Sequence, residues 1–125
     1  MDTYEGFSDW NDVAKEFFDY NWSDNVDVRM EKALAAIPEP EEVIYAEYHQ
    51  ESYEGSALVV FRNGDKFYWN QGSHCSCYGL EGQWSPEEYD RDTFIKVLDR
   101  KLEGNYFYRP ETEEVLRYIR EKVIA

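Results

Sequence analysis

The first third of the chain repeats its hydrophobic positions with the period of an α-helix. The spacing predicts a first helix, capped by Ser8 or Asp9, whose inner side carries Trp10, Val13, Phe17 and Tyr20. A second helix is expected after Ser23 or Asp24, with one apolar stripe of Val26, Met30, Ala33, Leu34 and Ile37. The segment "PEP" at 38–40 is expected to end it, because proline cannot continue a helix.

The period changes from 3.6 to two in the middle third, where residues 43–50, 56–62 and 66–71 are predicted strands. Asn63-Gly64 is expected to form the two-residue turn of a type I′ hairpin. That turn would place Val60 opposite Phe67 and Leu58 opposite Trp69, on a face that a helix layer should cover.

The last third returns to helical spacing. "SPEE" at 85–88 favours a short helical turn with Ser85 as N-cap, and a longer helix is expected from about Asp92 to a C-terminal Gly104. Pro110 is expected to open a final helix. The pattern predicts one α+β domain over residues 1–125, in which a three-stranded antiparallel meander with an Asn-Gly hairpin packs against about four helices.

The net charge of the chain limits the kinds of molecule that it is expected to bind. The chain has 27 acidic and 13 basic side chains, a formal net charge of −14, which repels nucleic-acid phosphates and anionic membranes and attracts basic proteins. Direct nucleic-acid binding and membrane binding are therefore not expected. The N-terminus resembles no signal peptide, and no apolar run approaches the roughly 20 residues needed to span a bilayer, so a cytoplasmic location is expected.

The acidic side chains are concentrated near the N-terminus, where residues 1–28 contain Lys15 as their one basic residue. Three- and four-residue spacing places Asp9, Asp12, Glu16 and Asp19 along one side of the first helix. Together with Glu39, Glu41 and Glu42, they form a predicted acidic face for contacting rows of Lys and Arg on a basic protein. The alternative is that these charges only confer solubility.

The segment "GSHCSCYGLEGQW" at 72–84 concentrates the residues that could carry chemistry. One interpretation is a structural corner with buried cysteines and glycine turns. A second is a stacking pocket for a small ligand or nucleotide, formed by Tyr68, Ser73, His74, Cys75, Cys77, Tyr78, Gln83 and Trp84. A zinc site or thiol enzyme would use His49, His74, Cys75 and Cys77, but the one-residue cysteine spacing is unlike a zinc knuckle, and no cofactor or catalytic residue is predicted.

The same segment, followed by "SPEEY" and preceded by the hairpin, resembles a segment of small acidic proteins encoded by bacteriophages and their bacterial hosts, over residues 43–100. No known activity comes with the resemblance. It implies a phage-type inhibitor or adaptor that counters a defence system in the host cytoplasm. With its acidic face, such a protein would imitate the charge of nucleic acid and bind a basic nuclease, CRISPR effector or regulator. Sequestration of a nucleotide signal is the alternative.

Overall fold

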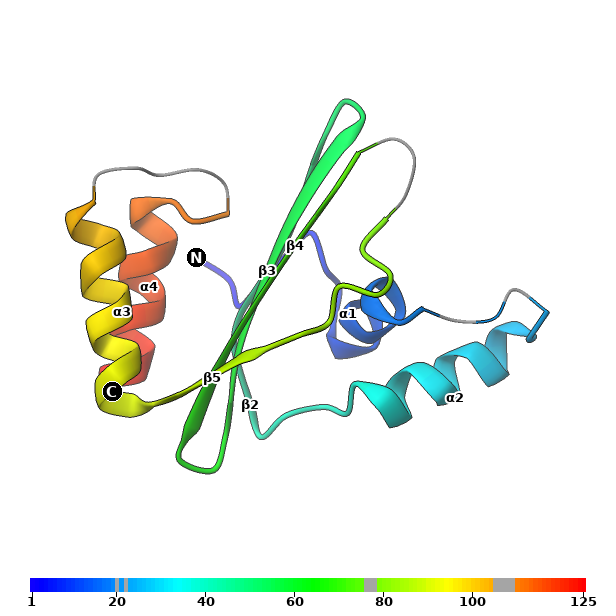
Figure 1. Ribbon diagram of the computed structural model, residues 1–125, viewed down its shortest axis with the longest axis horizontal. Coiled ribbons are helices and arrows are strands. Elements are labelled where there is room, and N and C mark those ends of the chain that lie inside the picture. The colour runs from blue at the N-terminus through cyan, green and yellow to red at the C-terminus, as the bar shows by residue number, and fades with distance from the viewer. Residues whose placement is uncertain (20, 22, 76–78, 105–109) are drawn as a thin grey trace.

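The fold has three layers, with a five-stranded sheet between two pairs of helices (Figure 1). The structure, a computed structural model, describes residues 1–19, 21, 23–75, 79–104 and 110–125. Its elements are β1 (Tyr4–Glu5), α1 (Trp10–Phe17), α2 (Val26–Ala36), β2 (Glu42–Glu51), β3 (Glu54–Asn63), β4 (Lys66–His74), β5 (Glu87–Asp90), α3 (Arg91–Glu103) and α4 (Glu113–Ile124). The α+β class is as predicted, but the sheet has five strands in the order β1-β2-β3-β4-β5, and the expected three are too few.

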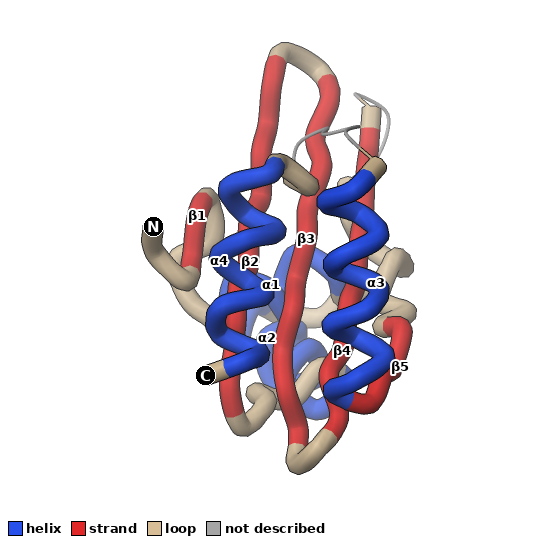
Figure 2. Tube along the Cα trace, turned by 90° about the vertical axis from the view of Figure 1, so that its left-hand side faces the viewer, coloured by secondary structure: helices blue, strands red, loops and turns tan. Residues whose placement is uncertain are grey.

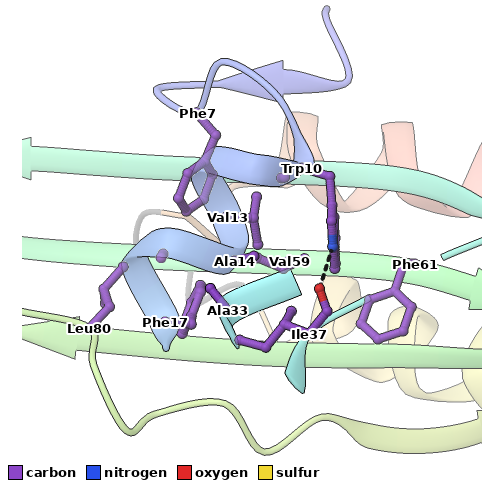
Figure 3. Close-up of a cluster of buried hydrophobic side chains, with 12 residues drawn as sticks. Phe7, Trp10, Val13, Ala14, Phe17, Ala33, Ile37, Val59, Phe61 and Leu80 are labelled. Carbon is purple, nitrogen blue, oxygen red and sulfur yellow. Dashed lines mark hydrogen bonds between the residues drawn. The ribbon is translucent and has the colours of Figure 1, made fainter. Parts of the chain in front are cut away.

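Both faces of the sheet are buried, whereas the sequence predicted one covered face. Alternate residues of β3 point to opposite sides: Val59 belongs to the core under α1 and α2, and its neighbour Leu58 to the core under α3 and α4. Figure 3 shows the first core, where the indole Nε1 of Trp10 donates a hydrogen bond of 2.9 Å to the Ile37 carbonyl. This bond ties the start of α1 to the end of α2.

A β-bulge in β2 adjusts the sheet to these two cores. Val43 pairs with Phe61 and Tyr45 pairs with Val60, so that Ile44 is the additional residue on β2. Ile44 and Tyr45 consequently both face α3 and α4.

The hairpin between β3 and β4 forms, but its register is shifted by one pair from the predicted one. Asn63 pairs with Lys66, so that the turn residues are Gly64 and Asp65, and Val60 lies opposite Trp69. Of the two turn residues, only Gly64 has a positive φ, +61°, which excludes type I′. The Asn63 side chain accepts a hydrogen bond from the Glu41 N–H instead of serving the turn. Each side chain nevertheless points to the predicted face of the sheet. The pairing is shifted by two residues, and side chains two residues apart on a strand point to the same face.

Two short strands were not predicted. β1 pairs in parallel with β2 at Ala46 and Glu47. β5 pairs with the start of β4 and replaces the helical turn expected at 85–88, since pairing with the exposed edge of β4 satisfies more backbone groups than one turn of helix does.

The helix boundaries follow the side chains that cap them. Asp9 caps α1 as predicted, but Asn25 caps α2 in place of Ser23 or Asp24, and Thr112 caps α4, which therefore begins after Pro110. Gly104 caps α3 in the right-handed region, so the left-handed C-terminal glycine expected there is absent. Tyr20 lies outside the described residues.

Candidate functional site

The two helical layers carry very different charges. Residues 1–41, which precede β2, hold 11 acidic and three basic side chains, whereas residues 91–125, which follow β5, hold seven acidic and eight basic ones. The net charges are −8 and +1. Because α1 and α2 cover one face of the sheet and α3 and α4 the other (Figure 1), most of this difference along the chain becomes a difference between the two outer faces. Asp2 and Glu5 are exceptions, since Asp2 lies near Tyr118 of α4 and Glu5 lines a cleft beside α4. Without them, residues 8–41 have nine acidic and three basic side chains, a net charge of −6.

The acidic surface that we consider the candidate site runs along α1 and consists of Asp9, Asp12, Glu16, Glu39 and Glu81. Burial raises the pKa of the half-buried Glu16 carboxyl, Lys15 lowers it, and the nearby carboxylates of Asp12 and Glu81 raise it further. Lys15 lies 3.7 Å from Asp12 and 3.9 Å from Glu16, and its exposed amine therefore neutralises this surface only in part.

The other end of the acidic surface lies beside β1. Burial raises the pKa of the Tyr4 hydroxyl, and the negative charges of Glu39 and Asp9 add to that shift. Two acids from different segments thus approach the same side chain, one from the cap of α1 and one from the loop before β2.

Three of the predicted acidic residues do not extend this surface along the helix. Asp19 lies beyond the C-cap of α1, residue Phe18, and so is not on the helix at all. Arg62 on β3 pairs with Glu41 at 3.1 Å and with Glu42 at 3.2 Å, which leaves those two carboxylates partly neutralised. Glu81, which the sequence analysis did not select, joins the surface because the loop before β5 folds back on α1, with a hydrogen bond from the Gly82 N–H to the Phe17 carbonyl.

The segment at 72–84 is bound to the sheet through Gln83. The Gln83 amide donates to the carbonyl oxygens of Ser73 and Gly79 at 2.8 and 3.0 Å, and its Oε1 accepts from the Ser73 N–H at 2.9 Å. Asn70 adds a hydrogen bond from the Ser85 N–H to its Oδ1 at 2.7 Å. The Gln83 side chain thus pairs with the edge of β4 beyond the end of β5. Its polar groups are used in hydrogen bonds within the fold.

Tyr68 and Trp84, the two rings of the predicted ligand pocket that the structure describes, are also packed against other side chains of the molecule. The Trp84 ring contacts Trp10 and Phe17 edge-on and stacks on Phe61 at 5.7 Å. Phe61 in turn stacks on Tyr68, whose hydroxyl donates to Glu88 at 2.7 Å. These rings form part of the core under α1. Gln83 and Trp84 are therefore engaged in the fold, whereas Cys75 is only partly buried, unlike the buried cysteines of the structural interpretation.

His74 makes the most specific contact of the segment. Its Nδ1 lies 3.0 Å from the Cys75 carbonyl, which can only accept, so Nδ1 carries the proton in the neutral ring and Nε2 accepts from the Tyr48 hydroxyl at 2.6 Å. Tyr48 and His74 come from the strands on either side of β3, and they meet above Gly55. A Cβ at Gly55 would lie 2.2 Å from His74 Nε2, so this bridge between β2 and β4 requires glycine there.

The candidate zinc ligands do not come together in the described residues. His74 shares the α1 face with Tyr48, whereas His49 follows Glu47 on the opposite face and lies 3.5 Å from Glu51. Within the ranges that the structure describes, no group of three or more His, Cys, Asp or Glu side chains is arranged to hold a metal ion. Cys77 and Tyr78 lie outside those ranges.

A cleft of about 370 Å³ opens beside β1, between β2 and the start of α4. Its lining includes the carboxylates of Glu5, Glu47 and Glu114, and Glu47 accepts a hydrogen bond of 2.5 Å from the Tyr45 hydroxyl. Three carboxylates disfavour an anionic ligand, so this cleft does not suit a nucleotide.

Comparison of the chain with protein-family models, curated protein sequences and solved structures gives no match. Within the described residues, no helix combines the length and the apolar composition needed to cross a bilayer.

Glu16→Gln is expected to raise the melting temperature at neutral pH. The raised pKa means that the folded chain binds this proton more tightly than the unfolded chain, so stability falls as the pH rises through the range in which Glu16 ionises. The difference from wild type should therefore shrink at pH values below the ordinary glutamate range. Thermal unfolding followed by circular dichroism across this pH range tests the expectation.

Glu31→Gln is the matched control, because Glu31 is an exposed glutamate on α2 and its substitution changes the net charge equally. An equal gain for both variants at neutral pH would contradict the role of burial at Glu16 and indicate a general effect of net charge.

Proposed function

We propose that the protein is a non-enzymatic inhibitor or adaptor that binds a basic protein through the acidic surface of α1. The observation that carries the proposal is the unequal charge of the two helical layers, with a net charge of −6 over residues 8–41, which include α1 and α2, and +1 over residues 91–125, which include α3 and α4. Solubility alone does not require the acidic side chains to gather on one face, whereas recognition of rows of Lys and Arg on a partner does require it.

The position of Glu16 supports the same proposal. Burial is the main cause that disfavours the ionised form of this carboxylate; Lys15 offsets part of that effect, and the like charges of Asp12 and Glu81 add to it. A cationic side chain from a partner would relieve that repulsion. A basic nuclease, CRISPR effector or regulator inside a host cell has such side chains where it binds nucleic acid, so occupation of that site by the acidic surface would act as nucleic-acid mimicry.

The test is capture of proteins from a bacterial lysate on the immobilised chain, with identification by mass spectrometry. The variant Asp9→Asn/Asp12→Asn/Glu16→Gln/Glu39→Gln removes four charges, and asparagine at position 9 still caps α1. We expect its affinity for a captured basic protein to fall by about fourfold or more, since exposed ion pairs each contribute about 0.2–1 kcal/mol. High salt should weaken the wild-type complex as well.

The matched control removes four exposed acids from the opposite helical layer: Asp92, Glu103, Glu114 and Glu121. Its net charge equals that of the first variant, so retained capture would assign binding to the acidic surface. Equal losses in the two variants, or capture that ignores salt, would overturn the proposal.

A further inference from the structure

The hairpin between β2 and β3 extends past the ends of the helices that cover the sheet (Figure 2). At its tip Glu51 pairs with Glu54, which leaves Ser52 and Tyr53 as the two turn residues. The Tyr53 side chain is 78% exposed, and of the large hydrophobic side chains in the described residues none is more exposed. A tyrosine in this position is available for contact with another molecule.

Two further features of the tip are unfavourable for the isolated chain. Glu51 and Glu54 lie directly opposite each other, and like charges in that relation destabilise a hairpin. Ser52 has φ +54°, a left-handed conformation that a residue with a Cβ adopts at a cost. These residues were not predicted as a site, although "ESYEG" between two β-rich runs marks the turn.

The chemistry of the tip matches one kind of side chain. Tyrosine offers a ring face to a cation. Glu51 and Glu54 lie on either side of Tyr53 in the sequence and pair across the hairpin, and the Glu51 carboxylate also lies 3.5 Å from His49. A guanidinium group can stack on an aromatic ring and hydrogen-bond to a carboxylate in the same plane, whereas an ammonium group is a compact, strongly hydrated charge. Tyrosine and arginine are also enriched among the residues that dominate protein interfaces.

We propose that the tip of the β2–β3 hairpin is a second contact point, at which Tyr53, Glu51 and Glu54 bind an arginine side chain of the basic partner. This inference rests on the proposed function and adds to it a preference for arginine over lysine. The acidic surface of α1 attracts either cation, and the hairpin tip distinguishes between them.

The probes that test this inference are fluorescently labelled oligoarginine and oligolysine peptides of equal length, titrated with the full chain and followed by anisotropy. Wild type should bind oligoarginine more tightly than oligolysine. Tyr53→Ala and Tyr53→Leu should each weaken oligoarginine binding roughly two- to fivefold, the range expected for an exposed cation–π contact, and leave oligolysine binding nearly unchanged. Tyr53→Phe keeps the ring and should keep the preference, and Glu51→Gln/Glu54→Gln should weaken both peptides.

Val26→Ala is the matched control, because Val26 on α2 is 73% exposed and lies far along the chain from the hairpin. It should change neither affinity. Oligoarginine binding that depends on the acids of α1 but is unaffected by Tyr53→Ala would overturn the role of the tip and leave the proposed function standing. Absence of wild-type binding to both peptides at low salt would overturn both.

Discussion

Gly6→Ala is expected to lower the free energy of unfolding by about 2–5 kcal/mol, from backbone strain together with a forced displacement in a packed region. Gly6 follows β1 with φ +80°, which alone disfavours alanine. A Cβ there would also lie 2.0 Å from the carbonyl oxygen of Tyr48, a backbone atom that cannot rotate away. β1 would have to separate from β2, and Phe7 would leave its contacts with Phe17 and Tyr48.

Gly82→Ala separates these two causes, because Gly82 has the same φ of +80° but no atom within 4 Å of an added Cβ. We expect a loss of about 1 kcal/mol there, from conformational strain alone. Urea unfolding followed by circular dichroism gives both values. Equal losses at the two glycines would show that the close approach of Gly6 to β2 contributes nothing.

Trp10→Ala is expected to cost about 3–5 kcal/mol, the range measured for removal of a large buried aromatic side chain. Trp10 is 2% exposed, packs edge-on against Phe61 and Trp84, and donates the hydrogen bond that holds Ile37. The core under α1 and α2 depends on it more than on any single aliphatic residue, because it joins both helices to the sheet (Figure 3).

Trp10→Phe keeps an aromatic ring and removes the indole N–H, leaving the Ile37 carbonyl without this donor. A loss of about 1–3 kcal/mol is expected for this variant. If it were as destabilising as Trp10→Ala, the retained phenyl ring would contribute nothing, and the parts lost in both variants, the indole N–H and the larger ring system, would account for the role of Trp10. A phenylalanine variant with unchanged stability would contradict the importance of the hydrogen bond. The same urea series decides between these results.

The helices and long strands could be predicted because each repeats its pattern over several residues. α1 is the clearest case, since Asp9 caps it and Trp10, Val13 and Phe17 are its buried side. β1 and β5, with two and four residues, are too short to show a period, and β5 follows a proline and serine that favour a helix. Only pairing with β2 and β4 determines these strands, and that pairing is a tertiary interaction.

The burial of the second face of the sheet could have been predicted from the sequence. Ala57, Val59 and Phe61 are as apolar as the residues between them, which is typical of a strand covered on both sides. A single covered face was predicted, but the four helices, a number also expected from the sequence, are enough to cover both faces.

The acidic surface could be predicted only in part, for a related reason. Asp12 and Glu16 follow from helix spacing, and Asp9 from its capping position. The pairing of Glu41 and Glu42 with Arg62 joins residues about 20 positions apart, and the approach of Glu81 to Glu16 depends on how the loop before β5 folds back. No local pattern contains either contact.

The unequal charge of the two helical layers also gives the molecule an electric dipole perpendicular to its sheet. A cationic protein at a distance of several nanometres in dilute salt would exert a torque on that dipole and turn the α1 and α2 layer toward itself before any side chains touch. Reversal of a few charges in the α3 and α4 layer would then alter the rate of association without touching a single contact residue.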